Sequence, residues 1–201
     1  MKIKFSAVLI LTISFVCSFI LFSCDQPSKP ANSVKKIGMV LDTGGDQDHG
    51  YNEYSLLGAK NAAQKAGIEF EYIVTTDRAD YDKNIKSLLD NNASLIFTIG
   101  FTQAEATAKA AKNHPDRHFV ILDFAYFPGM GCPGTVSDCY TPEGGLSNVT
   151  SIVFKEDQPA FLGGVFAACM SESKNIGVVA GEKIPPVLRL TQGFESGARS
   201  I

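Results

Sequence analysis

Short apolar runs alternate with longer amphipathic stretches along most of the chain, and this alternation predicts the fold. Apolar runs bounded by polar or glycine residues, or at 69–75 alternating polar and apolar residues, indicate strands. Apolar residues spaced three or four apart indicate helices. Strands are expected at 36–42, 69–75, 94–99, 118–122, 148–154 and 174–180. Helices are expected at 51–66, 81–89, 102–112, 156–170 and from 185 onward. Such alternation predicts an α/β fold with a parallel, doubly wound sheet and right-handed crossovers.

The apolar positions of two helices predict which side of each packs on the sheet. In the helix at 51–66 a face of mostly small residues is expected to lie close to the sheet. This face consists of Tyr54, Leu57, Gly58, Ala62 and Ala66. In the helix at 81–89 the expected inward residues are Tyr81, Ile85, Leu88 and Leu89. The segment 124–147 is expected to be a long irregular loop.

The first 24 residues differ from the rest of the chain. Lys2 and Lys4 precede an apolar run at 5–22, and this layout is typical of an export signal. The segment 21–24, Leu-Phe-Ser-Cys, resembles a lipobox, which implies cleavage before Cys24 and a lipid on its sulfur. The alternative is an uncleaved membrane anchor, because about 18 apolar residues nearly span a bilayer. Either arrangement leaves the body of the protein outside the cytoplasm and tethered to the cell membrane.

The segment after the predicted lipid anchor has little to bury. Residues 1–23 form the predicted signal peptide, and residues 24–35 form a polar, proline-rich, flexible tether. Removal of the signal peptide deletes Lys2 and Lys4 and no acid, so the formal net charge changes from −3 to −5. A mildly acidic exported domain without a basic cluster is not expected to bind nucleic acid.

Two cysteines lie in a loop that is rich in glycine and proline. Cys132 and Cys139 are separated by a short stretch, and an oxidising compartment makes a disulfide between them the expected state. A metal pair is disfavoured because no histidine lies near them in the sequence. We expect no metal and no cofactor.

Polar residues that follow two predicted strands form the candidate ligand site. Loops of this kind, between a parallel strand and the next helix, bind small ligands in open α/β sheets. Asp42 and Asp123 end neighbouring strands and can accept hydrogen bonds from ring N–H groups or from a ribose diol. Tyr51 offers a ring face, and Asn52 offers a donor and an acceptor to the edge of a heterocycle. Asp48 is a further candidate contact, with an N-cap role as its alternative.

Each of these side chains also has a purely structural interpretation. Packing against the core or hydrogen bonds within the loops remains the alternative for all five. As a set, they suit a neutral polar molecule with a flat face. The sequence therefore predicts a small-molecule binder.

Three motifs occur in order along the chain, at 42–58, 151–164 and 176–197. The first contains Asp-Thr-Gly-Gly followed by Asp-His-Gly-Tyr-Asn, the second Phe-Lys-Glu-Asp-Gln, and the third Gly-Phe-Glu-Ser-Gly. Together they resemble the signatures of the basic membrane protein family. Members of this family are exported lipoproteins similar to PnrA-like purine-nucleoside receptors of ABC importers. In this comparison Tyr51 stands where the family has phenylalanine, and Leu190 stands where it usually has phenylalanine.

The resemblance implies a fold, a function and a set of partners. The implied fold is that of a type I periplasmic binding protein, with a first lobe at 36–154 and an incomplete second lobe that starts at 155–201. The implied function is capture of a purine nucleoside for a membrane ABC permease, without enzymatic activity. The lipid on Cys24 would hold the protein at the membrane.

Other functions fit the sequence less well or only in part. A dinucleotide-binding loop needs a Gly-x-Gly-x-x-Gly spacing that Gly44 and Gly45 do not provide. A calcium loop fails because Gly50 and Tyr51 fill its fifth and sixth positions. A nucleoside hydrolase remains an alternative, although Gly44 replaces an acid that its metal site requires. A binding lipoprotein for a sugar or another small polar ligand also remains open.

Overall fold

The computed structural model describes residues 34–181 and 183–201, which form an α/β fold around one main parallel sheet. Residues 1–33 are outside the described part. The predicted signal peptide, the predicted lipidation site Cys24 and most of the predicted tether therefore lie outside the described residues.

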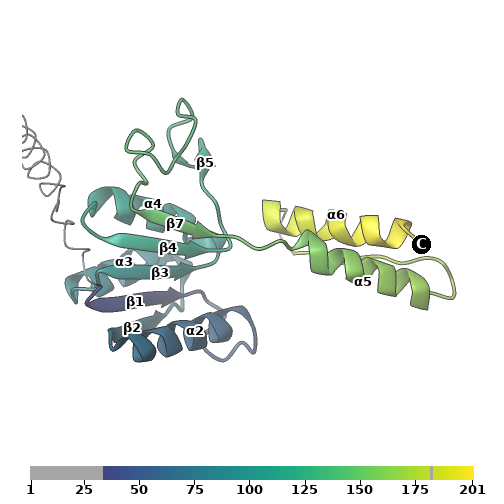
Figure 1. Cartoon of the computed structure of the whole chain (residues 1–201), viewed down its shortest axis with the longest axis horizontal. Helices are drawn as coiled ribbons and strands as arrows, with labels where there is room; N and C mark the ends of the chain where they lie inside the picture. The colour runs from purple at the N-terminus through teal and green to yellow at the C-terminus, as the bar shows by residue number, and fades with distance from the viewer. Residues whose placement is uncertain (1–33, 182) are drawn as a thin grey trace, which may run out of the picture. The chain divides into compact units, whose positions relative to one another are not determined.

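Five strands pair in the order β2-β1-β3-β4-β7, and every pairing in this sheet is parallel (Figure 1). The strands are β1 (Lys36–Leu41), β2 (Glu69–Val74), β3 (Leu95–Ile99), β4 (His118–Leu122) and β7 (Val149–Ile152). The predicted doubly wound parallel sheet is thus confirmed. Because β1 lies between β2 and β3, the winding direction reverses between β1 and β3. Such a switch point is where sheets of this order bind ligands.

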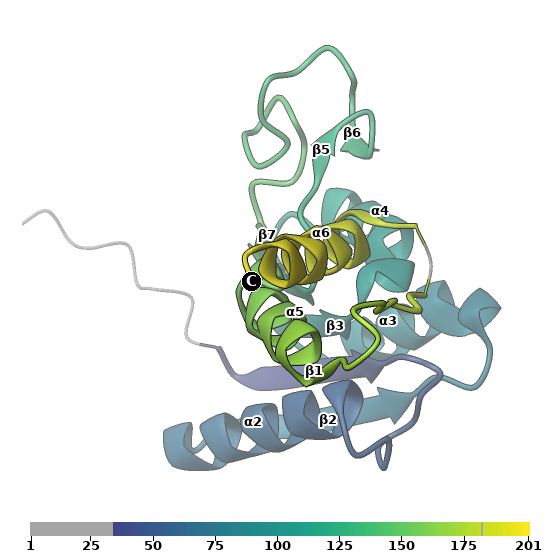
Figure 2. The same ribbon diagram turned by 90° about the vertical axis from the view of Figure 1, so that its right-hand side faces the viewer.

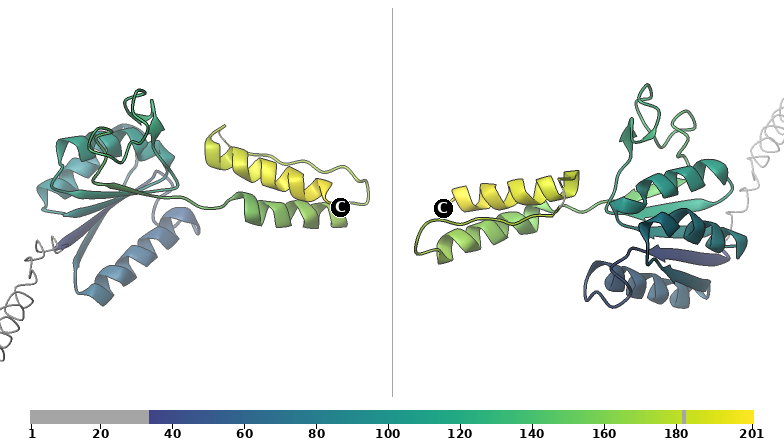
Figure 3. Two further views of the ribbon diagram at one scale, coloured as in Figure 1. Left: turned by 45° about the horizontal axis from the view of Figure 1, so that its top comes forward. Right: turned by 180° about the vertical axis from the view of Figure 1, so that it is seen from behind.

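Helices cover both faces of the sheet, with α2 on one face and α3 and α4 on the other (Figure 1, Figure 3). Their bounds are α2 (Tyr51–Ala66), α3 (Tyr81–Asp90), α4 (Ala104–Asn113), α5 (Asp157–Met170) and α6 (Pro185–Arg199). Two short 3₁₀ turns, η1 (Arg78–Asp80) and η2 (Phe101–Gln103), precede α3 and α4. Within the described ranges, no helix is both long and apolar enough to cross a bilayer.

The core divides into two clusters, one on each face of the sheet. Successive side chains of a strand point to opposite faces. Accordingly, Met39 and Leu41 pack with Leu56 of α2, whereas Val40 packs with the apolar faces of α3 and α4. The predicted inward face of α3 is confirmed, since all four of its residues are buried: Tyr81, Ile85, Leu88 and Leu89.

The predicted inward face of α2 is wrong. The residues of α2 that are buried are Asn52, Leu56 and Ala63, whereas Tyr54 and Leu57 are 67% and 52% exposed. The predicted face also contained Gly58, Ala62 and Ala66, which are exposed. Small residues have little apolar surface to bury, so Leu56 and the inward hydrogen bonds of Asn52 determine which side of the helix faces the sheet.

The helices α5 and α6 pack side by side and run in the same direction (Figure 1, Figure 2). Their backbones approach so closely that glycine is required at the contact. A Cβ atom on Gly197 would lie 1.9 Å from the carbonyl oxygen of Phe161, and one on Gly164 would lie 2.0 Å from that of Phe194. Glycines at these positions therefore form the interface between the two helices.

The strand predicted at 174–180 is absent. These residues connect α5 to α6 and belong to neither a helix nor a strand. A strand needs a neighbouring strand to bond its backbone N–H and C=O groups. In the described part of the chain the parallel sheet ends at β7, and no strand lies beside 174–180. The apolar pattern of 174–180 is therefore not enough to make this segment a strand.

The segment 124–147 is largely irregular, as expected, and is held together by side chains. It contains two short strands, β5 (Phe127–Pro128) and β6 (Gly131–Cys132). Cys132 and Cys139 form a disulfide with a Cα–Cα distance of 5.4 Å, and both cysteines are buried. The hydroxyl of Tyr140 accepts a hydrogen bond from the backbone N–H of Tyr126 at 2.8 Å.

Candidate functional site

The candidate site lies at the carboxyl ends of β1, β3 and β4, which follow one another in the sheet. The expectation that Asp42 and Asp123 end neighbouring strands is wrong, because β3 pairs between β1 and β4. Asp42 follows β1, Thr102 lies in η2 just after β3, and Asp123 follows β4. Adjacent strands are about 4.8 Å apart, so the chain positions of Asp42 and Asp123 are about 10 Å apart across the end of β3. This edge includes the switch point between β1 and β3.

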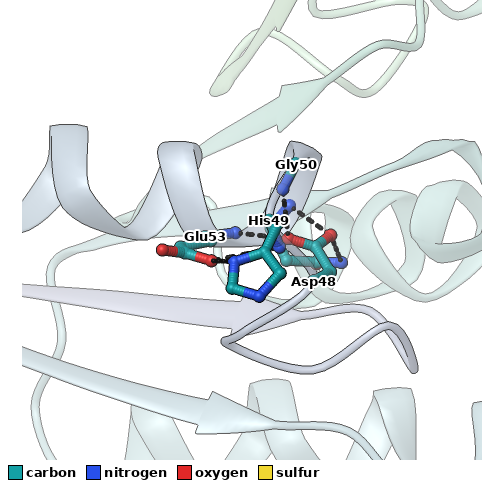
Figure 4. A network of polar contacts seen from close by, with 5 residues as sticks. Asp48, His49, Gly50 and Glu53 are labelled. Atoms are coloured by element: carbon teal, nitrogen blue, oxygen red, sulfur yellow. Dashed lines mark hydrogen bonds and ion pairs between the residues drawn. The ribbon is translucent and has the colours of Figure 1, made fainter.

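Asp48 organises the loop that joins β1 to α2. Its carboxylate accepts hydrogen bonds from the backbone N–H groups of Asn52, Gly50 and Glu53, at 2.9, 3.0 and 3.0 Å. Figure 4 shows Asp48 facing this first turn of the helix, while His49 points toward Glu53. The bonds from Asn52 and Glu53 hold the pKa of Asp48 far below its usual value. Asp48 therefore caps α2.

Asn52 also serves the loop. Its side-chain oxygen accepts from the backbone N–H of Asp42 at 2.9 Å, and its side-chain nitrogen donates to Asp48 at 3.0 Å. The side chain is only 5% exposed. A Cβ atom on Gly44 would lie 2.7 Å from this nitrogen, so the glycine leaves room for the amide. One donor and one acceptor of Asn52 are thus engaged inside the loop, which favours the structural alternative given for this residue. A contact between Asn52 and a ligand stays a prediction.

Asp42 is partly buried and held by donors from three directions. One oxygen accepts from the backbone N–H of Thr43 at 2.7 Å and from the hydroxyl of Tyr81. The other accepts from the hydroxyl of Thr102 at 3.1 Å. Burial, together with the hydrogen bond to Asp42, raises the pKa of Tyr81 to about 12, so its phenol remains a donor at neutral pH.

Asp123 sits in strained backbone at the end of β4. Its φ angle is +63°, a left-handed conformation that is uncommon for residues other than glycine. Its backbone N–H donates to the carbonyl of Ile152 at 2.7 Å, which ties it to the end of β7. Burial and the neighbouring carboxylate of Glu156 raise the pKa of Asp123 to about 6. Strain of this kind concentrates at functional sites.

A cavity of about 530 Å³ lies beside Asp123. Tyr51 lines it together with Phe154, and the ring centroids of these two residues are 6.4 Å apart. Burial, followed by the charges of Asp123 and Glu156, raises the pKa of Tyr51 above its usual value. The remaining lining residues are Lys155, Glu156, Pro159, Ala160, Leu190 and Phe194. The lining is thus mainly apolar and aromatic, and it includes the carboxyl groups of Asp123 and Glu156.

The five predicted ligand contacts divide into groups. Tyr51 and Asp123 line one cavity. Asp42 lies at the same edge of the sheet but is not among the residues that line this cavity. Asn52 and Asp48 support the loop between β1 and α2.

Several residues of this region had no predicted role. Phe154 lies two residues after β7 ends. The rule of polar residues after strands did not select it, because it is apolar and the predicted strand at 148–154 included it. Glu156 accepts two hydrogen bonds from Arg189, at 2.9 and 3.2 Å. These two residues are 33 positions apart, and a single sequence contains no signal that pairs them.

Throughout 34–181 and 183–201, no group of three or more His, Cys, Asp or Glu side chains is arranged to hold a metal ion.

A parallel α/β lobe with a cavity at its strand ends is an arrangement that binds small ligands. The similarity to a solved ABC transporter solute-binding protein places this lobe among type I periplasmic-binding folds. The model of the Bmp family, described as ABC transporter substrate-binding protein PnrA-like, matches residues 35–201. The chain therefore belongs to this family, and the resemblance drawn from the three motifs is confirmed.

Relatives in sequence and structure agree with this membership. The chain is 29% identical over 170 residues to the ABC transporter nucleoside-binding protein BmpA of Lactococcus lactis, covering 83% of this chain and 44% of that protein. It is 30% identical over 168 residues to an uncharacterized lipoprotein of Pyrococcus furiosus, covering 82% and 38%. A solved solute-binding protein of an Aeropyrum pernix ABC transporter system is similar, with a TM-score of 0.65, 25% identity and coverage of 82% and 43%. The chain thus spans less than half the length of these relatives.

Proposed function

We propose that the protein is a lipid-anchored, extracytoplasmic substrate-binding protein that captures a purine nucleoside for an ABC importer. The observation that carries the proposal is the cavity that Tyr51 and Asp123 line together, because it combines an aromatic wall with a hydrogen-bond acceptor. Family membership supports the substrate-binding role. The Lactococcus lactis relative is named as a nucleoside-binding protein, and this supports the choice of ligand.

The aromatic wall suits the base. Stacking on the ring of Tyr51 contributes about 0.5–1.5 kcal/mol beyond the burial of apolar area. Leu190 and Phe194 add apolar surface on the α6 side of the same cavity. A purine has two broad apolar faces, so it fills a slot of this kind better than a sugar alone does.

The carboxylates suit the donors of a nucleoside. Asp123 accepts hydrogen bonds from the ribose hydroxyl groups, and Asp42 accepts from another donor of the ligand. Their positions at the ends of β4 and β1, about 10 Å apart, match a ligand that has donors at both ends. A buried donor without an acceptor costs about 1–3 kcal/mol, so this arrangement selects against ligands that lack these groups.

Import requires a second lobe and a partner. In this proposal residues 36–154 form the first lobe, residues 155–201 begin the second, and residues near 153–156 form part of the hinge. Closure of the lobes excludes water from the ligand. The closed form then docks on a membrane ABC permease. Cleavage before Cys24 and lipidation of its sulfur keep the protein at the membrane surface.

Calorimetry of the purified full-length protein tests the ligand assignment. The titrants are inosine, guanosine and adenosine, with ribose and hypoxanthine as fragments that carry only one half of a nucleoside. We expect binding of at least one nucleoside and much weaker binding of both fragments. Absence of heat with every nucleoside would refute the assignment, and tight binding of ribose alone would favour a sugar-binding lipoprotein.

The same samples test the hydrolase alternative. After incubation with each nucleoside in the presence of calcium, the release of free base is measured by chromatography. We expect the nucleoside to remain intact. Steady release of base in proportion to protein concentration would instead identify a hydrolase.

A further inference from the structure

Three side chains from three different elements meet at the switch point of the sheet. Asp42 follows β1, Tyr81 is the first residue of α3, and Thr102 lies in η2 after β3. The hydroxyl of Tyr81 contacts one carboxylate oxygen of Asp42, and the hydroxyl of Thr102 lies 3.1 Å from the other. The two hydroxyl groups are themselves 3.1 Å apart. The carboxylate of Asp42 and the two hydroxyl groups are therefore all in mutual contact.

The directions of these hydrogen bonds follow from the chemistry of the groups. An ionised carboxylate only accepts, so Tyr81 and Thr102 must each direct their proton to Asp42. Tyr81 is 5% exposed, which leaves water little access to compete for its hydroxyl. Two donors on different oxygens prevent rotation of the carboxylate about its bond to Cβ.

The remaining capacity of Asp42 can be counted. A carboxylate has about four acceptor positions, two on each oxygen. The oxygen Oδ1 accepts from the backbone N–H of Thr43 and from Tyr81, whereas Oδ2 accepts from Thr102. One acceptor position therefore remains, and it is on Oδ2.

We propose that Tyr81 and Thr102 are positioning residues that orient Asp42 so that Oδ2 accepts a single hydrogen-bond donor from the ligand. This inference rests on the proposed function, because it takes Asp42 as a ligand contact. It adds to that function the number of ligand donors that Asp42 can accept. Asp42 accepts one N–H or O–H group, and it does not form a two-oxygen contact with a pair of ligand donors.

The test uses substitutions that remove a hydroxyl but keep the shape of the side chain. Tyr81→Phe and Thr102→Val are each made in the natural protein and in an Asp42→Asn background. Calorimetry with the nucleoside that binds most tightly among inosine, guanosine and adenosine gives the affinities. We expect each substitution to weaken binding about 10-fold in the natural protein and less than 2-fold in the Asp42→Asn background.

Two control variants separate positioning from general structural damage. Thr102→Ser keeps the hydroxyl and should retain the natural affinity. Tyr72→Phe removes a comparable hydroxyl, which donates to Asp46 at 3.2 Å, and should leave the affinity unchanged. Equal losses of affinity in the natural and Asp42→Asn backgrounds, or no loss in either, would overturn the inference.

A crystal structure of the ligand-free Tyr81→Phe/Thr102→Val variant provides a readout that does not depend on ligand affinity. We expect the Asp42 carboxylate to leave its present orientation, and an unchanged orientation would overturn the inference. If the natural protein binds no nucleoside, the proposed function fails and the inference fails with it. If nucleosides bind and only the positioning tests fail, the proposed function stands without this inference.

Discussion

The ring of Tyr51 meets the ring of Phe154 edge to face, with centroids 6.4 Å apart and an angle of 77° between the ring planes. Tyr51 begins α2, and Phe154 follows β7, so the contact joins two distant parts of the chain at the cavity wall. Perpendicular aromatic pairs contribute about 0.5–1.5 kcal/mol beyond area burial. This contact stabilises the orientation of the Tyr51 ring without a ligand.

The first prediction concerns the ring of Tyr51. Tyr51→Ala should weaken nucleoside binding by about 2 kcal/mol, roughly 30-fold, because it removes both stacking and buried apolar area. Tyr51→Phe keeps the ring and should retain affinity within about 3-fold. Calorimetry on both variants checks the prediction. Equal losses in the two variants would show that the hydroxyl, rather than the ring, contributes to binding.

The second prediction concerns the charge of Asp123, whose pKa of about 6 is raised by burial and Glu156. Because the ionised form is the better acceptor, nucleoside affinity should fall as the pH decreases through 6. Between pH 7 and pH 5 the ionised fraction falls about 10-fold, and the affinity should fall by a similar factor. Calorimetry at several pH values measures the nucleoside affinity as a function of pH. Asp123→Asn should bind more weakly at pH 7 and lose the pH dependence.

The neighbours of Asp123 provide a check on the cause of this pH dependence. The charge of Arg189 lowers the pKa of Asp123, and that of Glu156 raises it. Arg189→Met should therefore move the midpoint of the affinity profile to higher pH, and Glu156→Gln should move it to lower pH. Shifts in the opposite directions would contradict the assignment of the titrating group to Asp123.

The third prediction concerns stability and Asp48, whose pKa is lowered by hydrogen bonds from the backbone of Asn52 and Glu53. A lowered pKa contributes stability that is present above the unfolded value of 3.8 and is lost as the pH falls below it. Asp48→Asn should therefore destabilise the protein at pH 7, and the difference from the natural protein should shrink from pH 4 downward. Urea unfolding at pH 7, 4 and 2.5 measures the difference. A difference that stays constant with pH would contradict the capping role.

The fourth prediction compares two glycines. Gly197→Ala places a Cβ atom 1.9 Å from the carbonyl oxygen of Phe161 and should destabilise the α5–α6 pair by about 2 kcal/mol or more. Gly58→Ala is the matched control, because nothing lies within 4 Å of the added Cβ atom in α2. It should stabilise the protein by about 0.5–1 kcal/mol. Thermal unfolding of both variants checks the opposite signs.

Much of the fold follows from local patterns. Apolar runs, and for β2 the alternation of polar and apolar residues, predicted the five strands of the main sheet. The central strands β1 and β3 are mostly buried, whereas β2 has no fully buried residue. The face of α3 was predictable because Ile85, Leu88 and Leu89 are large and apolar. The face of α2 was not, because the hydrogen bonds of Asn52 and the packing of Leu56 outweigh a row of small residues. The segment 174–180 is largely apolar but forms no strand, because a strand needs a neighbouring strand to bond its backbone and the described residues provide none there.

The candidate site was predictable only in part. Strand ends located Asp42 and Asp123, since the ends of parallel strands meet at one edge. The engagement of Asn52 with Asp42 and Asp48 was not predictable, because it depends on how the loop closes. The pairing of Glu156 with Arg189 joins positions far apart in the chain, and the charge around Asp123 depends on that pairing.

A crystal structure of the full-length protein with the best-binding nucleoside tests the central claim most directly. The predicted result is a base against the ring of Tyr51, with a donor of the ligand hydrogen-bonded to Asp123 in the same cavity. A nucleoside bound elsewhere, with Tyr51 and Asp123 free of contact to it, would contradict the proposal.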